Sequence, residues 1–172
     1  MYRIKYSQSF VQERIAATVR ELTESGVINP NTVFLVMLNG GVWFASHLFD
    51  EIPDMLNEVY FIKGHSYQGA SRGELIWDLS PEPGLQNRQV VVLDDICDSG
   101  HTTNAIYDAL RPLTSQVSFL TLLRRTTCAI KPEVTLYSCI IDDSDDFFVG
   151  CGLDDYGAAR MLPFVGVIPK NE

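Results

Sequence analysis

The sequence reads Val-Val-Val-Leu-Asp-Asp-Ile-Cys-Asp-Ser-Gly-His-Thr-Thr from Val90 to Thr103, and this stretch decides the fold. Its first four residues are apolar, which predicts a strand buried on both faces, as in a parallel sheet. The apolar run stops at Asp94 and Asp95. Because open α/β sheets bind ligands at the carboxyl ends of their strands, we expect the two acids to lie at a ligand site.

Small and hydroxylated residues follow from Asp98 to Thr103, and Asn104 to Leu110 has a helical pattern. Such a loop directs backbone N–H groups and hydroxyls at one point, and the following helix adds its positive end. We therefore predict a phosphate-binding loop. The two acids beside it indicate either a divalent metal or the vicinal hydroxyls of a sugar. The alternative is a strand that ends in a polar turn, with Asp98 or Ser99 capping the helix.

This stretch resembles the 5-phosphoribosyl 1-diphosphate (PRPP) motif of type I phosphoribosyltransferases, and the chain looks most like their 6-oxopurine branch, the hypoxanthine-guanine enzymes. The resemblance implies a purine salvage enzyme that uses Mg²⁺ and PRPP. It would convert hypoxanthine or guanine to the nucleoside monophosphate, with release of diphosphate. Asp98 is then the general acid/base. The PRPP-binding residues that the resemblance implies are Asp94, Asp95, Ser99, Gly100, His101, Thr102, Thr103, Asn39, Gly40 and Arg160.

A second strand and glycine turn precede this stretch. Thr32 to Leu38 is apolar, Asn39-Gly40-Gly41 follows, and Val42 to Phe49 is predicted to be helical. In the resembled family this turn binds diphosphate, which implies a cis peptide bond between Leu38 and Asn39. Familiar members carry Lys or Arg where Asn39 stands, so one positive charge is missing here. The alternative is an ordinary glycine-rich turn.

The purine-binding residues are also implied by the resemblance. Val117 to Leu123 alternates as a strand, and Arg124 at its end stands where the family has a Lys that recognises the 6-oxo group. An Arg donates through a larger, planar group, so the preferred base stays open, as does the choice between Arg124 and Arg125. Phe147 is the implied stacking residue. Phe148 and Asp154 are further base-binding residues, and the implied Mg²⁺ ligands are Asp94, Asp95 and Asp154.

The segment around Ser66 and Tyr67 resembles the flexible active-site loop of the family. A loop of this kind excludes water, which would otherwise capture a ribosyl cation. The alternative is the tip of a hairpin without a catalytic role. Near the N-terminus, Ser9 to Glu24 has helical periodicity, and Ser9 with Gln12 resembles a capping box. Trp43 and Phe44 are expected in the core.

Length and composition predict one domain over residues 1–172, because the chain is 46% hydrophobic and alternates strands with helices. We expect an α/β fold with a doubly wound, mostly parallel sheet, to which the resemblance adds a small hood and a flexible loop. It also implies a homodimer or homotetramer. The four cysteines form no CxxC pair, which favours reduced thiols and a cytoplasmic protein.

A net charge of −9 disfavours binding to nucleic acid or to an anionic membrane surface. The sequence contains no apolar run long enough for a membrane span, and its start lacks the apolar core of a signal peptide. Two functional alternatives stay open. One is a phosphoribosyltransferase for xanthine-guanine or another base. The other is a regulator that senses PRPP or nucleotides and binds RNA, which would require a basic face.

Overall fold

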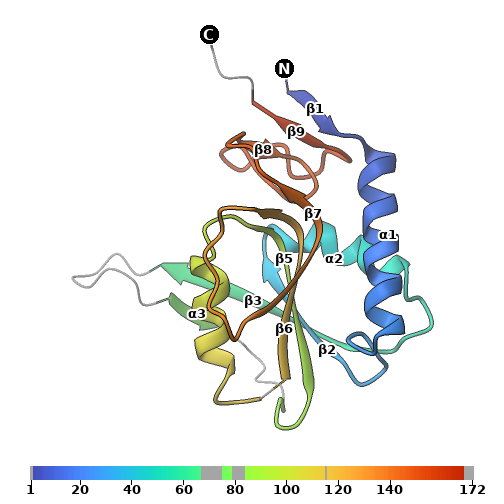
Figure 1. The fold of residues 1–172 in the computed structure, drawn as a ribbon, viewed down its shortest axis with the longest axis vertical. Coiled ribbons are helices and arrows are strands. Elements are labelled where there is room, and N and C mark those ends of the chain that lie inside the picture. Colours follow the sequence, from blue (N-terminus) through green and yellow to red (C-terminus); the bar gives the residue numbers. More distant parts are fainter. Residues whose placement is uncertain (1, 67–74, 79–83, 115, 169–172) are drawn as a thin grey trace.

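The sheet at the centre of the molecule has six strands in the order β4-β3-β2-β5-β6-β7 (Figure 1). A computed structural model describes residues 2–66, 75–78, 84–114 and 116–168. In chain order the strands are β2 (Val33–Leu38), β3 (Glu58–Ser66), β4 (Leu75–Asp78), β5 (Gln89–Cys97), β6 (Gln116–Arg125) and β7 (Thr135–Asp142). β3, β2, β5, β6 and β7 run parallel, and β4 pairs antiparallel with β3.

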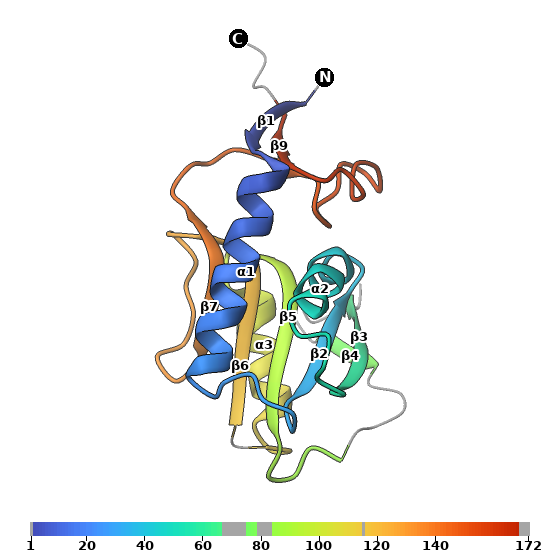
Figure 2. The same ribbon diagram turned by 90° about the vertical axis from the view of Figure 1, so that its right-hand side faces the viewer.

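Helices cover both faces of this sheet (Figure 2). α1 (Gln8–Glu24) and α2 (Gly41–Asp50) lie on one face, and α3 (His101–Leu110) lies on the other. A parallel sheet needs both faces covered, since its connections return over them. The predicted α/β, doubly wound fold class is confirmed.

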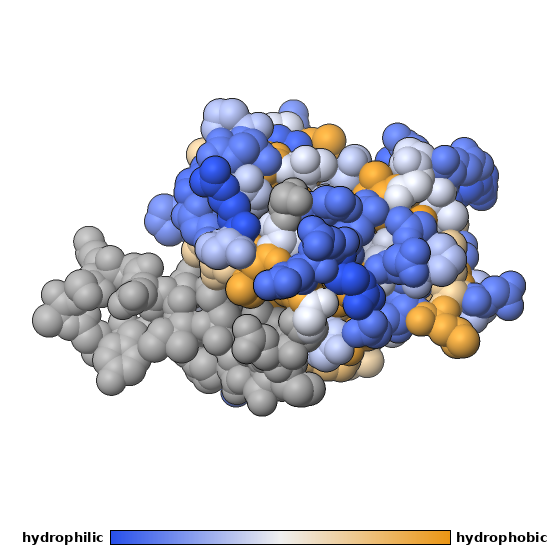
Figure 3. Space-filling view, turned by 90° about the horizontal axis from the view of Figure 1, so that it is seen from below, coloured by the Kyte–Doolittle hydropathy of each residue, from blue (hydrophilic) through white to orange (hydrophobic). Residues whose placement is uncertain are grey.

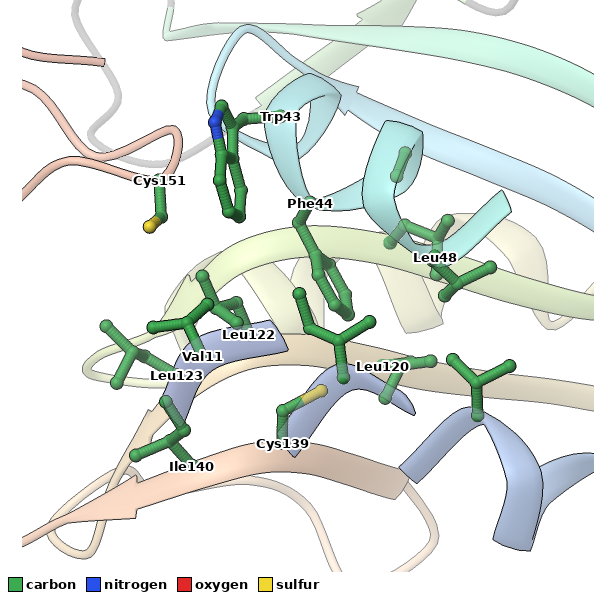
Figure 4. Close-up of a cluster of buried hydrophobic side chains, with 14 of the residues drawn as sticks. Val11, Trp43, Phe44, Leu48, Leu120, Leu122, Leu123, Cys139, Ile140 and Cys151 are labelled. Carbon is green, nitrogen blue, oxygen red and sulfur yellow. The ribbon is translucent and has the colours of Figure 1, made fainter. Parts of the chain in front are cut away.

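The core consists of two clusters, one on each face of the sheet. On the α1–α2 face, Phe44 is fully buried and points from α2 toward Leu120 of β6 (Figure 4). Trp43 is also buried, so the expectation that both aromatics belong to the core is confirmed. On the α3 face, Ile106 and Leu110 belong to the cluster that contains Val92. β5 is therefore buried on both sides, as its apolar run predicted.

The start of α1 differs from the prediction. Ser7 takes an extended conformation and its Oγ accepts a hydrogen bond of 3.3 Å from the Phe10 N–H, so the helix begins at Gln8. The prediction that Ser9 caps the helix was wrong, because Ser9 already has helical geometry.

A second, smaller sheet forms a hood over the carboxyl ends of the parallel strands (Figures 1 and 2). It contains β1 (Arg3–Tyr6), β9 (Val165–Val167) and β8 (Phe148–Val149), in that order and antiparallel. β1 was not predicted from the sequence. The chain thus places its first residues beside its last strand, next to the edge where the acids lie.

The opposite end of the molecule has a different character. Most of the described surface there is hydrophilic, with apolar residues scattered over it (Figure 3). Across the described ranges, none of the helices is both long and apolar enough for a membrane crossing.

Candidate active site

Asp94 and Asp95 lie where the ladder between β2 and β5 opens. β2 pairs with β5 only as far as Leu93, whereas β6 stays paired with β5 up to Cys97. The strand β5 therefore extends beyond the predicted apolar run, and both acids lie within its C-terminal half. The Asp95 N–H donates to Asp94 Oδ1 at 2.9 Å. The Asp94 carboxylate therefore turns back onto the Asp95 backbone, and both acids lie near the carboxyl end of β5.

Burial, followed by the charge of the Asp95 carboxylate, raises the pKa of Asp94 well above its ordinary value. Burial also raises the pKa of Asp95, although hydrogen bonds and the positive charge of Arg160 act in the opposite direction. Two neighbouring carboxylates with raised pKa values favour a ligand that brings a cation or donates hydrogen bonds, because either relieves their repulsion. A sugar with two hydroxyls and a metal-bound phosphate supplies both.

The turn between β2 and α2 lies directly on Asp95. A Cβ at Gly40 would be 1.9 Å from Asp95 Oδ2, so only glycine permits this approach. The peptide bond between Leu38 and Asn39 is cis, which confirms the expectation for this turn. Asn39 itself is exposed, and its side chain carries no charge. The Asn39 side chain therefore brings no positive charge to an anion at this turn.

A hood segment closes the other side of this turn. Gly152 has φ +102°, and a Cβ there would meet the Gly40 carbonyl oxygen at 2.1 Å. Arg160 donates to the Gly152 carbonyl at 2.7 Å and pairs with Asp154 Oδ1 at 2.7 Å. Asp154 Oδ2 accepts from the Gly157 N–H at 2.7 Å. The predicted diphosphate arginine and the predicted metal-side acid thus lie together beside Asp95.

The predicted phosphate loop joins β5 to α3. Gly100 has φ +87°, and a Cβ there would lie 2.5 Å from the Ala129 carbonyl oxygen. The Ala129 N–H in turn donates to the Ser99 carbonyl at 3.0 Å. Ser99 Oγ accepts a hydrogen bond of 3.4 Å from the His101 N–H at the start of α3, and the side chains of His101 and Thr102 are exposed there. A helix N-terminus of this kind can bind phosphate through the other amides of its first turn.

Thr103 does not take part in this loop through its side chain. It is buried, and its hydroxyl lies 3.4 Å from Cys97 Sγ. The prediction that the Thr103 hydroxyl binds phosphate is corrected, because the third residue of α3 faces the sheet. All four cysteines are free and buried, which agrees with the expected reduced thiols.

Among the residues predicted to bind a purine, the structure brings Asp98 and Arg125 together. Arg125 Nε forms an ion pair with Asp98 Oδ1, and its side chain is 15% exposed, whereas that of Asp98 is 63% exposed. Arg124, which was predicted to recognise the base, instead donates to Cys128 Sγ at 3.3 Å. Adjacent residues of a strand point to opposite faces, so only one of the two arginines reaches Asp98.

The two adjacent phenylalanines also differ. Phe147 is 55% exposed, whereas Phe148 is 5% exposed. The Arg125 guanidinium lies 4.6 Å from the centre of the Phe148 ring. Phe147 therefore has an accessible ring, and the ring of Phe148 belongs to the wall behind Arg125. Of the predicted loop residues, Ser66 ends β3 and Tyr67 lies outside the described residues.

Within the described ranges, no three His, Cys, Asp or Glu side chains converge as a preformed metal site. The predicted ligand set of Asp94, Asp95 and Asp154 is therefore not a closed cage, and Asp154 is engaged by Arg160. The oxygens of Asp94 and Asp95 nevertheless suit Mg²⁺, which commonly binds through one or two carboxylates together with substrate phosphates. The arrangement fits a metal that arrives with a diphosphate.

Sequence reasoning left the choice between Arg124 and Arg125 open, and it missed the N-terminal residues Lys5 and Tyr6. Lys5 Nζ contacts Asp142 and Asp146, more than 130 positions along the chain, and lies 5.2 Å from the Phe148 ring centre. The alternation of β6 indicated that Arg124 and Arg125 face different ways. It did not indicate which way, since Leu122 and Leu123 are both apolar and both buried, so the two faces of the strand end have the same character.

Comparisons with known proteins agree with this geometry. The model of the phosphoribosyl transferase domain matches residues 7–156. A hypoxanthine-guanine-xanthine phosphoribosyltransferase of Tritrichomonas foetus is 28% identical over 98% of this chain and 92% of its own length. A hypoxanthine-guanine phosphoribosyltransferase of Mycoplasma pneumoniae is 32% identical over 81% of each chain. The crystal structure of a hypoxanthine phosphoribosyltransferase from Staphylococcus aureus superposes with a TM-score of 0.83 at 25% identity, over 97% of this chain and 91% of that one.

Proposed function

The chain belongs to the phosphoribosyltransferase family, in its hypoxanthine-guanine branch, and from that premise we propose that it transfers the phosphoribosyl group of PRPP to a 6-oxopurine. Its products are the nucleoside monophosphate, IMP or GMP, and diphosphate. One observation carries the proposal. Asp94 and Asp95 lie at the end of β5, between the glycine turn at Gly40, which touches Asp95, and the loop that leads into the N-terminus of α3.

PRPP fits this arrangement at three points. The amides of Ser99 to Thr102, with the hydroxyls of Ser99 and Thr102, bind the 5′-phosphate. Asp94 and Asp95 accept hydrogen bonds from the ribose hydroxyls. The amides of the Asn39-Gly40 turn and the guanidinium of Arg160 bind the diphosphate, which is the leaving group. The missing charge at Asn39 leaves Arg160 as the nearby cation that the described residues supply on this side.

Mg²⁺ would bind between the diphosphate and the oxygens of Asp94 and Asp95, where it neutralises the leaving group. The protein's own contribution is to orient the anomeric carbon toward the purine. With the phosphate and diphosphate ends both fixed, the ribose has little freedom to turn away from the base.

The purine binds between Asp98 and Phe147. Phe147 is accessible and stacks on the base. Asp98, the proposed general acid/base, exchanges a proton with N7 while N9 attacks the ribose. We assign recognition of the 6-oxo group to Arg125 instead of Arg124, because Arg125 is the arginine that contacts Asp98.

Arg125 suits a carbonyl acceptor. A guanidinium carries five N–H donors, and three groups in the described part of the chain accept from it: Asp98 Oδ1, the Ser144 carbonyl and the Asp146 carbonyl. The two terminal nitrogens each keep one further N–H for a ligand. This places hydrogen-bond donors next to the general acid/base, as a 6-oxopurine requires.

An assay of nucleotide formation tests the proposal. Purified protein with PRPP and Mg²⁺ is incubated with hypoxanthine, guanine, xanthine, adenine or uracil, and products are separated by chromatography. The proposal expects IMP or GMP, and the ratio of rates names the preferred base. Nucleotides from adenine or uracil alone would instead support a different branch. Binding of PRPP without turnover of any base would support a regulator.

We also propose that the protein is a cytoplasmic homo-oligomer, a dimer or a tetramer. Four apolar side chains that are at least a third exposed lie on β2, α2 and β3, namely Leu38, Val42, Val59 and Phe61. Because β2 pairs with β3 in parallel, some of these side chains lie on the same face of the sheet. Sedimentation equilibrium of the wild-type chain and of Phe61→Glu tests whether this surface is an interface between copies. A monomeric wild type contradicts it.

A further inference from the structure

β1 contacts the turn that follows β7. Lys5 Nζ is 2.9 Å from Asp142 Oδ2, 2.6 Å from Ser144 Oγ and 2.8 Å from Asp146 Oδ2. Its side chain is 21% exposed. One ammonium thus uses its three donors on three residues of a single turn.

Asp142 is the centre of this turn. Its Oδ2 accepts from the Tyr6 hydroxyl at 2.5 Å, and its Oδ1 accepts from the N–H and the hydroxyl of Ser144 at 2.8 and 2.6 Å. Burial acts to raise the pKa of Asp142, but hydrogen bonds from Ser144, Tyr6 and Lys5 outweigh it and hold that pKa below its ordinary value. The carboxylate is therefore ionised and fixed from both sides.

The same turn holds Arg125. The backbone carbonyls of Ser144 and Asp146, both in the turn, each accept a hydrogen bond of 2.5 Å from a terminal nitrogen of the Arg125 guanidinium. The Phe148 ring lies near both cations, with Lys5 Nζ at 5.2 Å and the Arg125 guanidinium at 4.6 Å from its centre. Movement of the turn would therefore move the guanidinium, because two of its three contacts come from this backbone.

We propose that Lys5 is a positioning residue for the purine site, which acts by fixing the Asp142–Asp146 turn so that its carbonyls hold Arg125 against Asp98. The inference rests on the proposed function. Loss of the ammonium leaves Asp142 and Asp146 close together without their shared cation, and their repulsion opens the turn. PRPP is bound by other loops, so the effect falls on the purine.

Steady-state kinetics of Lys5→Met test this inference. With PRPP saturating, the KM for hypoxanthine is expected to rise about tenfold or more, since small misplacements at a site cost up to about a hundredfold in rate or binding. The KM for PRPP is expected to change by less than about twofold. Lys5→Arg restores the cation and is expected to restore most of the loss.

Lys131→Met is the matched control. Lys131 also pairs with an acid, Asp108, and this pair is more exposed than that of Lys5, with side chains 39% and 58% exposed. It is expected to keep wild-type constants. Ser144→Ala is a milder second variant, because it removes only the hydroxyl that Lys5 and Asp142 share. Ser144→Ala is also expected to raise the KM for hypoxanthine more than the KM for PRPP. This variant keeps the inference testable if Lys5→Met does not fold.

Three results would overturn the inference. Unchanged constants in both Lys5→Met and Ser144→Ala would show that the turn does not position the base site. Equal loss for both substrates, with a lower Tm and no rescue by Lys5→Arg, would show a structural role only. A wild-type chain without transferase activity would refute the proposed function itself, and the inference with it.

Discussion

Arg125 is held at three points, and this determines what it offers to a ligand. Asp98 accepts a hydrogen bond from Nε. The Ser144 carbonyl accepts one from the first terminal nitrogen, and the Asp146 carbonyl accepts one from the second. The plane of the guanidinium is therefore fixed before a base binds, so less rotamer freedom is lost on binding. Arg124, its neighbour in β6, contacts Cys128 instead.

The two arginines form a natural matched pair for a test of base recognition. Arg125→Lys is expected to lower kcat/KM by about tenfold for both hypoxanthine and guanine, because a point charge replaces the fixed planar donor to the 6-oxo group that the two bases share. Arg124→Lys is expected to leave both values within about twofold. Initial rates with both bases measure them. A change in Arg124→Lys alone would return the role to Arg124.

Asp98→Asn tests the acid/base role. The side chain keeps its shape but no longer accepts a proton, so kcat is expected to fall about a hundredfold or more. The KM for PRPP is expected to stay within about threefold, since the amides of the loop are unchanged. Full kcat in this variant contradicts the assignment.

At the scale of elements, three segments meet at two glycines. The β2–α2 turn touches Asp95 of β5 at Gly40, and the hood segment touches the same turn at Gly152. Glycine is required at both places because a Cβ has no room. The β2–α2 turn is thus packed tightly between Asp95 and the hood segment.

Gly40→Ala is expected to weaken PRPP binding about tenfold or more, because its Cβ displaces the Asp95 carboxylate. The control is Gly84→Ala. No atom lies within 4 Å of a Cβ at Gly84, so that variant is expected to bind as the wild type does. Calorimetric titration with PRPP and Mg²⁺ compares the two. Equal affinities would show that the turn is not part of the site.

Local pattern was enough to predict most of the elements around the site. The apolar run of β5, the glycine turn after β2 and the loop before α3 were all predicted, because short-range composition determines them. The direction in which individual side chains point was harder to predict from the sequence. Thr103 turned inward toward Cys97, and Arg125 replaced Arg124 beside Asp98. Both depend on strand and helix phase at an element's end, where periodicity is weakest.

At the scale of the whole molecule, the hood is tied to the sheet through the first residues of the chain. Arg3 pairs with Val167 in the hood, and two positions later Lys5 reaches Asp142 at the end of β7. No local pattern predicts a contact across so many positions. The hood itself was expected from the resemblance, but its N-terminal strand and the ion-pair network were not.

Asp142→Asn tests this tie. At pH 7 the free energy of unfolding is expected to fall by about 1–3 kcal/mol, since buried donors lose their acceptor. The pKa of Asp142 is lowered in the folded protein, so its contribution is complete above the unfolded value of about 4 and is lost as the pH falls below it. Urea unfolding should therefore show a gap between variant and wild type that is constant from pH 7 to about pH 5 and narrows as the pH falls below about 4.

Asp143→Asn is the control for that experiment, because Asp143 is exposed and the change removes the same charge. It is expected to unfold within about 0.5 kcal/mol of the wild type at every pH. A constant gap for Asp142→Asn across the pH range would contradict the role of the ionised carboxylate.

The central claim is that Asp94 and Asp95 grip the ribose of PRPP while the loop before α3 holds its phosphate. Calorimetric titration of PRPP with Mg²⁺ into the wild type and into the double variant Asp94→Asn, Asp95→Asn tests it most directly. We expect the wild type to bind and the double variant to bind at least about tenfold more weakly, because hydrogen bonds to charged acceptors are lost. Equal affinities, or a wild type that does not bind PRPP, would contradict the claim.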